Sequence, residues 1–252
     1  MIGSESHTGH DQQKRRSRPK EKNVPNYLRA IRYCALVVPF SCLVLGIMAE
    51  ASAPPSLQIL TEARHILSVE KESHYQHTTH VDEAAGVYDF DCSGLLCHIL
   101  KKVAPEHLEV VPTSKRHARP LASQFYEFFT AAGEKGSHGW RQIARLRDAL
   151  PGDILVWRKP EQVVGKDTGH VMIVDDPPVE DGTGIYRIVV IDSTETPHGD
   201  DSRKDGASGI GRGTMWFIAD GEGRPVAYHW RLRAGKPHDM QIAIGRAIDA
   251  SN

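Results

Sequence analysis

The sequence predicts an α+β fold, in which several helices come first along the chain and an antiparallel sheet follows. Apolar residues recur at helical spacing before residue 150, whereas short runs rich in Val, Ile, Trp and Tyr dominate after it. Turn sequences containing Gly, Asp and Pro separate these runs, so the connections between strands are short. Short connections favour antiparallel pairing, and the segregation of helices from strands is typical of α+β domains.

The predicted elements of this domain lie within residues 54–252. Helices are predicted where apolar side chains repeat with a helical period, at 54–70, 92–103, 120–132 and 140–149. A polar, histidine-rich loop is predicted between the first two helices, at 71–91. Strands are predicted at 154–157, 171–174, 185–191, 214–219 and 226–231. A Gly-rich, charged loop is predicted at 196–213, and a closing helix at 239–250.

The overall composition is that of an ordinary globular protein and excludes few functions. The chain has 252 residues, of which 40% are hydrophobic and 25% charged. Its formal net charge is −1, so the chain has no general electrostatic attraction to polyanions, and no nucleic-acid partner is expected.

The first 53 residues differ from the rest of the chain. Residues 1–32 are polar and contain a cluster of Lys and Arg, a composition that cannot bury a core. Residues 33–53 contain an apolar run of 17 residues, interrupted by Pro39 and followed by Ala-x-Ala sequences ending at Ala51 and Ala53. This pattern is typical of a secretory signal peptide, since a spanning helix needs about 20 apolar residues. We therefore expect an exported protein that contacts the membrane only if this segment is retained as an anchor.

The strongest candidate for chemistry is the sequence Asp91-Cys92-Ser93-Gly94 at the start of the second predicted helix. Asp91 is a favourable N-cap residue, which places Cys92 in the first helical turn. The free N–H groups and the positive end of the helix dipole favour a thiolate there, whereas the Asp91 carboxylate opposes it. The same N–H groups could hold an oxyanion. A buried structural cysteine is the alternative, because free cysteines are frequently part of the core.

The other cysteines are expected to have no catalytic role. Cys34 and Cys42 lie in the apolar run near the N-terminus. Cys97 lies in the same predicted helix as Cys92, where five residues give a rise of about 7.5 Å. Because a disulfide needs Cα atoms within about 7 Å, these two cysteines should not pair. Cys97 fits the description of a structural core residue.

A histidine and an aspartate are predicted to meet across a hairpin. His170 begins one strand, and Asp192 ends the next, with a turn at Asp181-Gly182 between them. Pairing that is symmetric about residue 181 places His170 directly opposite Asp192, with Cβ atoms about 4.5–5.5 Å apart. An aspartate in that position can orient the ring and stabilise the imidazolium. A shift of the register by one residue would place Asp192 on the wrong face, and His170 would then be a structural histidine.

Three segments in this order resemble the NlpC/P60 family of bacterial cysteine peptidases: 90–95 (FDCSGL), 151–155 (PGDIL) and 169–174 (GHVMIV). The resemblance covers about residues 75–195. It implies a papain-like fold in which N-terminal helices, one carrying the cysteine nucleophile, pack on a five-stranded antiparallel sheet that carries the histidine. It also implies that Cys92 is the nucleophile, His170 the base and Asp192 the third catalytic residue. Peptides of the bacterial cell wall would be the substrates, and no cofactor would be needed.

The resemblance further implies which residues contact the substrate. Asp91 and Ser93 would help to recognise the substrate amine, and Tyr88 would line the cleft in place of a tyrosine often found just upstream of the cysteine. Residues 86–90 depart from the family pattern, because they lack its Tyr-x-x-Gly-Gly run.

Two further patterns suggest other sites. His74, His77 and His80 recur every third residue, as metal ligands can, but they lie in a predicted loop, and no metal is expected. Residues 209–213 (GIGRG) are similar to a phosphate-binding loop, yet no Lys-Ser or Lys-Thr follows them. We interpret this segment as a flexible loop.

Taken as a sequence, the chain is therefore expected to be an exported thiol hydrolase that cleaves peptidoglycan stem peptides or another amide substrate. Three alternatives remain open. The protein could be a thiol amidase, esterase or acyltransferase with a different substrate, a catalytically silent binding module on the same fold, or a metal-dependent hydrolase that uses the three histidines.

Overall fold

The computed structural model describes residues 52–159, 168–231 and 235–249. The predicted basic segment at 1–32 and almost all of the predicted signal sequence at 33–53, with Cys34 and Cys42, lie outside these residues. Among the described helices, none combines the length and the apolar character that crossing a membrane requires.

The described residues form four α-helices: α1 (Pro55–Val69), α2 (Cys92–Val103), α3 (Pro105–Glu109) and α4 (Ala122–Ala132). The predictions of helices at 54–70, 92–103 and 120–132 are confirmed. Proline occupies a first-turn position in α1, where its missing N–H costs nothing. The next proline, Pro105, ends α2 at Val103 and begins α3.

The segment 71–91, which was expected to be a loop, contains a small hairpin. Strands β1 (His80–Asp82) and β2 (Val87–Asp89) are antiparallel, with His80 opposite Asp89. Residues before β1 also run beside β2, through parallel bridges that join Glu72 to Val87 and Tyr75 to Phe90. Three-residue strands rich in charge and histidine have no clear alternating pattern, which explains why the sequence did not reveal them.

The main sheet is antiparallel in every ladder that joins its described strands, and it has nine strands instead of the five predicted. Eight follow the order β10-β9-β8-β7-β5-β4-β11-β3, and β6 pairs with β7. Their bounds are β3 (Trp140–Gln142), β4 (Ile154–Arg158), β5 (Gly169–Val174), β6 (Val179–Glu180), β7 (Ile185–Thr194), β8 (Gly209–Ala219), β9 (Pro225–His229), β10 (His238–Asp239) and β11 (Gln241–Ala247). The predicted α+β class is therefore confirmed at the level of a mixed structure with a mostly antiparallel sheet.

The predicted closing helix at 239–250 is wrong, because this segment forms β10 and β11. Two contacts require the extended form. A Cβ at Gly245 would lie 2.6 Å from ring atoms of Phe129, so the backbone itself packs on α4. Arg246 donates from Nε and Nη2 to the two carboxylate oxygens of Asp153, at 2.7 and 2.8 Å. The predicted helix at 140–149 is also wrong, since Trp140 pairs with Ala247 in the sheet and only a 3₁₀ turn, Leu146–Asp148, follows.

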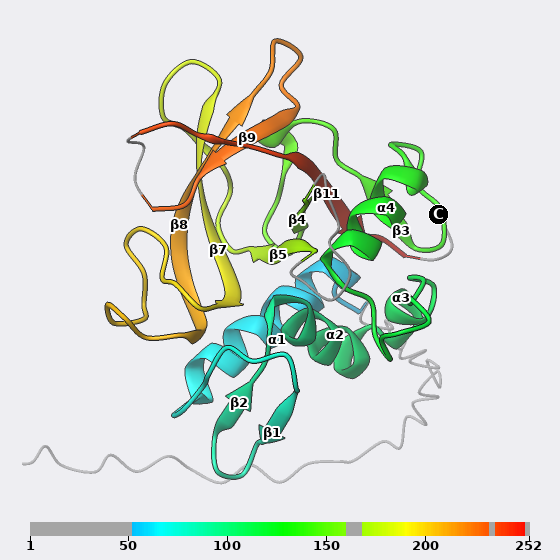
Figure 1. Ribbon diagram of the computed structural model, residues 1–252. Coiled ribbons are helices and arrows are strands. Elements are labelled where there is room, and N and C mark those ends of the chain that lie inside the picture. The colour runs from blue at the N-terminus through cyan, green and yellow to red at the C-terminus, as the bar shows by residue number, and fades with distance from the viewer. Residues whose placement is uncertain (1–51, 160–167, 232–234, 250–252) are drawn as a thin grey trace, which may run out of the picture. The chain divides into compact units, whose positions relative to one another are not determined.

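Alternate side chains of the sheet belong to two separate hydrophobic cores. One face packs on the helices, and Figure 1 shows these helices gathered together beside the sheet. Val156, Val171 and Ile173 belong to this first core. The opposite face forms a second core that includes Trp157 and Met172. α2 packs against β5 and β7, so the first turn of this helix lies close to the strands that carry His170 and Asp192.

The register between β5 and β7 differs from the predicted one by two residues. Ile173 lies opposite Ile191, whereas symmetric pairing about residue 181 would place it opposite Val189. The turn is centred later than expected, because Asp181 N–H bonds to the carbonyl of Ile185 and closes the hairpin beyond Gly182. A shift of two residues keeps every side chain on its face. His170 and Asp192 therefore share a face, as predicted, but lie diagonally instead of directly opposite.

Candidate active site

The first turn of α2 presents Cys92 at the edge of the sheet. Asp91 is the N-cap, and its Oδ1 accepts a hydrogen bond of 2.7 Å from the N–H of Gly94, which confirms the predicted cap. Cys92 is the first residue of the helix, and its side chain is only 6% exposed. The N–H groups of Cys92 and Ser93 belong to those that helix geometry leaves without an intrahelical acceptor.

His170 lies at the start of β5, where Gly169 allows a close approach to β4. Gly169 has φ +143°, and a Cβ there would lie 2.0 Å from the carbonyl oxygen of Trp157. The ring of His170 interacts electrostatically with the Cys92 side chain, and its Nε2 lies 2.5 Å from Oδ2 of Asp192. The structure thus brings together all three predicted catalytic side chains. Because Nε2 faces Asp192, Nδ1 is the ring nitrogen left to face the thiol.

The electrostatics of His170 favour its protonated form. Burial of the ring acts to lower its pKa, but the negative charge of Cys92 and the hydrogen bonds with Asp192 and Cys92 outweigh this effect. The result is a pKa of about 9, compared with an ordinary value of 6.5. The imidazole therefore carries a proton at neutral pH, as a thiolate–imidazolium pair requires.

Asp192 is fully buried and is held by three groups. Its Oδ2 accepts from Nε2 of His170 and, at 2.7 Å, from Nε2 of His198. Its Oδ1 accepts from Nη2 of Arg203 at 3.0 Å. Burial acts to raise the pKa of Asp192, but the positive charges of His198 and Arg203 and the hydrogen bonds from both imidazoles hold it well below 3.8. A carboxylate can only accept, so both histidines donate from Nε2.

Residues 196–208, which supply His198 and Arg203, form a loop as predicted, but the flexible loop predicted at 209–213 is wrong, because these residues begin β8. Asp201 accepts from the backbone N–H of His198 at 2.6 Å and from Nε of Arg203 at 2.8 Å. The glycines at 209–213 are the start of β8, where they leave room for this segment. A Cβ at Gly211 would lie 2.3 Å from Nε of Arg203, and one at Gly213 would lie 2.5 Å from Asp201.

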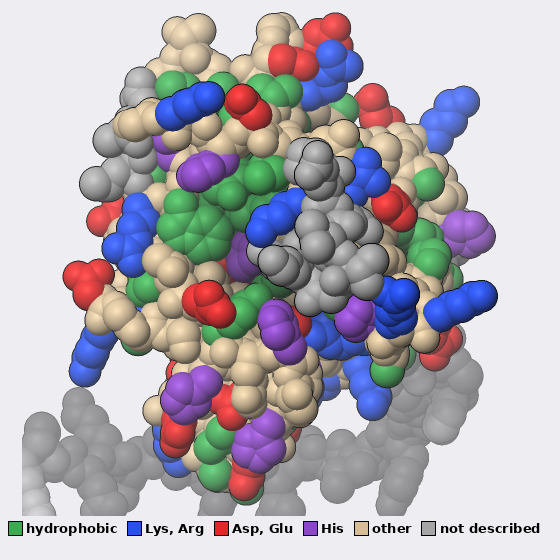
Figure 2. Space-filling view, in the orientation of Figure 1, with side chains coloured by type: hydrophobic (Ala, Val, Ile, Leu, Met, Phe, Trp, Pro, Cys, Tyr) green, Lys and Arg blue, Asp and Glu red, His purple; other side chains and the backbone are tan. Residues whose placement is uncertain are grey.

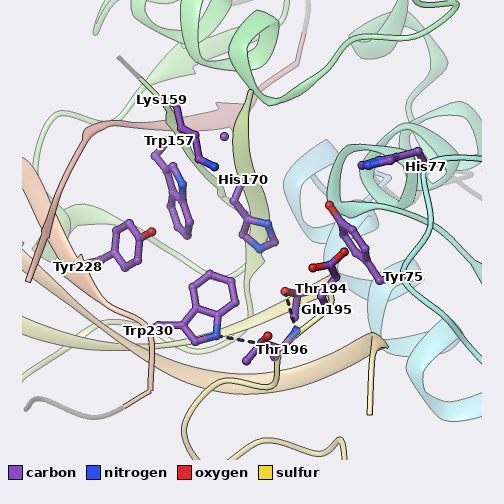
Figure 3. Close-up of a pocket in the computed structure, with 11 residues that line it drawn as sticks. Tyr75, His77, Trp157, Lys159, His170, Thr194, Glu195, Thr196, Tyr228 and Trp230 are labelled. Carbon is purple, nitrogen blue, oxygen red and sulfur yellow. Dashed lines mark hydrogen bonds between the residues drawn. The ribbon is translucent and has the colours of Figure 1, made fainter. Parts of the chain in front are cut away.

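A cleft with a volume of about 410 Å³ opens beside His170. Figure 3 shows His170 between an aromatic side, with Trp157, Tyr228 and Trp230, and an opposite side with Tyr75 and His77. Its lining is completed by Lys159, Gly169, Thr194, Glu195 and Thr196. Figure 2 shows apolar side chains gathered on this face of the molecule, with histidine side chains close by.

The aromatic side of the cleft shields His170. Trp157 and Tyr228 stack with ring centroids 4.2 Å apart, and the centroid of Trp157 lies 5.1 Å from that of His170. Trp230 lies 5.4 Å from His170 and 4.3 Å from His198. Its indole N–H donates to the carbonyl of Thr196 at 3.1 Å, a bond drawn in Figure 3, which ties Trp230 to the loop after β7. The sequence did not indicate that these residues line a cleft, because aromatic side chains in strands are equally typical of a hydrophobic core.

Asp91 and Ser93, predicted to recognise a substrate amine, are both bonded to Arg119. Nη2 of Arg119 lies 2.7 Å from Oδ2 of Asp91, and Nη1 donates to Oγ of Ser93 at 2.6 Å. Both acceptors are buried. The positive charge and hydrogen bonds of Arg119 outweigh the effect of burial and lower the pKa of Asp91. An incoming amine would therefore have to compete with a guanidinium that already satisfies this carboxylate.

Tyr88 was predicted to line the cleft, and the structure places it elsewhere. Its side chain is 2% exposed, belongs to the first hydrophobic core and packs against Phe90, with ring centroids 6.5 Å apart. Burial and the nearby negative charge of Glu83 raise its pKa. The tyrosine that lines the cleft is Tyr75, in the segment that runs beside β2.

The three histidines at 74, 77 and 80 do not converge on one point. His74 and His80 contact opposite oxygens of Asp89, at 3.1 and 3.4 Å, and His77 contacts Asp91 at 3.2 Å. A different trio in the described chain, His170, Asp192 and His198, lies close enough to hold a metal ion. However, its Nε2–Oδ2 separations of 2.5 and 2.7 Å are hydrogen-bond lengths. Tetrahedral zinc ligands lie about 3.3 Å apart, and the guanidinium of Arg203 on the same carboxylate further disfavours a cation.

Cys97 contrasts with Cys92. Both cysteines are free, as predicted, and both are buried. The thiol of Cys97 lies within α2 and donates to the carbonyl of Pro120 at 3.7 Å. Burial raises the pKa of Cys97 to about 12, so this residue stays a thiol.

Comparison with known proteins finds a similarity to a viral protein, but that protein has no stated activity that could indicate a function. The chain is 26% identical over 186 residues to an uncharacterized protein of Acanthamoeba polyphaga mimivirus. The matched region is 64% of this chain and 80% of the viral protein. No family model matches the chain, and no solved structure matches it significantly. The functional argument therefore depends on the geometry of the site.

Proposed function

We propose that this chain is a cysteine hydrolase with a papain-like arrangement of the NlpC/P60 type, acting on peptide or other amide bonds. The observation that supports this proposal most strongly is the buried cluster of Cys92, His170 and Asp192 at the N-terminus of a helix, in which His170 is bonded to Asp192 and is influenced by the charge of Cys92. A structural cysteine would not need a charged imidazole beside it. The raised pKa of His170 and the adjacent cleft add further support.

Each residue has a defined role in the proposed reaction. The Cys92 thiolate attacks the carbonyl carbon, and the N–H groups of Cys92 and Ser93 bind the resulting oxyanion. The C–N bond then breaks, and His170 gives its proton to the leaving amine. Water attacks the thioester while His170 removes its proton, the C–S bond breaks, and the acid product leaves with the thiolate restored. Asp192 keeps the ring oriented and stabilises its charged form.

The arrangement of the site supports the proposed type of reaction more specifically than it supports any particular substrate. Resemblance to NlpC/P60 peptidases favours stem peptides of peptidoglycan, together with export through the predicted signal sequence. The bond between Arg119 and Asp91 removes the amine-binding carboxylate that the resemblance implied. A thiol amidase, esterase or acyltransferase with the same nucleophile is therefore the second candidate.

The chemistry is tested by the reactivity of Cys92 towards iodoacetamide in the full-length chain, with mass spectrometry to identify the modified cysteine. We expect rapid modification of Cys92 well below pH 8, slowed by His170→Ala, because the imidazolium stabilises the thiolate. Cys97, on the same helix, is the internal control and should react only after unfolding. If Cys92 reacts as slowly as Cys97, or if its reaction rate is the same in His170→Ala as in wild type, the proposed function is wrong.

The substrate is tested with defined muropeptides and, in parallel, with simple amide, ester and acyl-acceptor pairs. Products from muropeptides in wild type but not in Cys92→Ala would support the peptidase. Products only from the simple acyl donors would favour the second candidate. Turnover that is abolished by a chelator and survives Cys92→Ala would instead assign a metal to His170, Asp192 and His198.

A further inference from the structure

Asp192 serves two imidazole rings through one oxygen atom. Nε2 of His170 and Nε2 of His198 lie 2.5 and 2.7 Å from the same Oδ2, and all three side chains are buried. We propose that His198 is a positioning residue that competes with His170 for Asp192 and so limits how tightly the catalytic imidazole holds its proton. This inference rests on the proposed function, since it concerns the acid–base step at His170.

His198 can act on the site only as a donor through Nε2. The acceptor is an ionised carboxylate, so Nε2 carries a proton whether the ring is neutral or charged. The other ring nitrogen, Nδ1, is buried and has no hydrogen-bond partner among the described residues. The single hydrogen bond to Asp192 is therefore the interaction that orients the polar atoms of this ring.

The position of His198 is fixed on several sides. Its backbone N–H donates to Asp201, which in turn binds Arg203, and Arg203 reaches the other oxygen of Asp192. The indole of Trp230 lies 4.3 Å from the imidazole, centroid to centroid. Gly213 of β8 leaves room for His198, because a Cβ at Gly213 would lie 2.8 Å from Cβ of His198. The ring cannot swing away from Asp192 without disturbing these contacts.

Competition for one oxygen has a definite chemical consequence. A carboxylate whose charge is shared with other donors stabilises the His170 imidazolium less than an unshared one would. His170 must release its proton to the leaving amine, so an imidazolium held too tightly is a poor general acid. The other charged or titratable groups that face His170, directly or across the cleft, are Cys92, Arg203, His77, Lys159, Glu195, Tyr75 and Tyr228.

The inference is tested by ¹⁵N NMR titration of the imidazole of His170 in the full-length chain, with His170→Ala to assign the signals. Wild type should titrate near pH 9. His198→Leu removes the competing donor, so the midpoint should rise by roughly one pH unit, within the range that changed neighbouring charges and hydrogen bonds produce. His198→Gln places an amide N–H near the position of Nε2 and should return the midpoint towards the wild-type value.

Matched variants separate this effect from general damage. His107→Leu changes another buried histidine, which bonds to the carbonyl of Ile248, and should leave the midpoint of His170 unchanged. If His198→Leu does not fold, His198→Asn removes the donor at Nε2 with a polar side chain. An unchanged or lowered midpoint in a folded variant overturns the inference. Titration of wild-type His170 near 6.5 would instead overturn the proposed function itself.

Discussion

Two cysteines on one helix show how single residues acquire different chemistry from their surroundings. Cys92 occupies the first turn of α2, beside a buried imidazolium, whereas Cys97 lies one turn and a half further on and donates to a backbone carbonyl. The residue type is the same, and only the neighbouring charges and the exposed helix N–H groups differ. At the scale of the residue, therefore, Asp192 is as important to the proposed chemistry as Cys92, because it keeps the His170 ring in place.

Removing the negative charge of Asp192 should weaken the link between the protonation of His170 and the reactivity of Cys92. In Asp192→Asn the shape of the side chain is kept, but one of the two acceptor oxygens is replaced by an NH2 donor, and the negative charge that raises the pKa of His170 is lost. We expect the pKa of His170 to fall below 9, and turnover of any substrate found for wild type to fall by about 10²–10⁴-fold. The pH profile of Cys92 alkylation and a steady-state rate measure both effects.

Asp153 supplies the matched control for this variant. It is also buried and bound to an arginine, Arg246, but it lies in the turn before β4 and anchors β11. Asp153→Asn should lower stability while leaving the pH profile of Cys92 unchanged. Equal profiles in wild type and Asp192→Asn would show that Asp192 does not support the imidazolium.

At the scale of elements, the start of β8 is shaped to receive the segment that holds Asp192. Gly211 lies directly opposite Asp192 in the β7–β8 ladder. The missing side chain at Gly211 is replaced by the stem and guanidinium of Arg203, which crosses over the strand. The glycines in residues 209–213 are therefore spaces for a neighbouring segment, although their sequence suggested a flexible loop.

Gly211→Ala should displace that segment. The new Cβ would fall 2.3 Å from Nε of Arg203, so Arg203 has to move away from Asp192. We expect a loss of about 1–3 kcal/mol in the free energy of unfolding, typical of overpacking, together with faster alkylation of Cys92 at neutral pH, because a carboxylate that is no longer shared with Arg203 stabilises the His170 imidazolium more strongly. Urea unfolding and the alkylation rate measure the two effects.

The control for this substitution is Gly221→Ala, in the turn between β8 and β9, where a Cβ meets nothing within 4 Å. This variant should keep both stability and reactivity. If Gly211→Ala behaves in the same way as Gly221→Ala, the segment carrying Arg203 does not depend on the space above β8.

At the scale of the whole molecule, local sequence patterns predicted α1, α2 and α4, whereas the wrong predictions concern segments whose structure depends on long-range contacts. α2 was predicted with its bounds because its apolar spacing and Asp91 cap are local in sequence. The last strand was mistaken for a helix, since its extended form depends on Asp153 and Phe129, about one hundred residues earlier. The pairing of His170 with Asp192 followed from strand alternation, which tolerates a two-residue error in register. His198 and Arg203 could not be predicted, because only the fold brings this loop over β8.

The buried charges of the site should also make the stability of the whole fold depend on pH. The pKa of His170 is raised in the folded state, from 6.5 to about 9, so this imidazole binds more protons in the folded state than in the unfolded chain between these values. Its contribution is fully present below pH 6.5 and is lost as the pH rises through 9. Asp192, whose pKa is lowered, acts in the opposite sense: its contribution is present above 3.8 and is lost as the pH falls through its folded value.

Urea unfolding of the full-length chain at pH 6 and pH 8 tests this dependence. In wild type the proton that Cys92 gives up as a thiolate offsets the proton that His170 gains, so we expect the free energy of unfolding to change little between these two values. In Cys92→Ala this offset is absent, so the free energy of unfolding should fall as the pH rises, by about 1.4 kcal/mol for each pH unit by which Asp192 still raises the pKa of His170. Cys97→Ala should keep the wild-type dependence, since at pH 8 its thiol is mostly protonated in both the folded and the unfolded state. The same fall in wild type and Cys92→Ala would mean that Cys92 keeps its proton in the folded state, so that no thiolate–imidazolium pair forms.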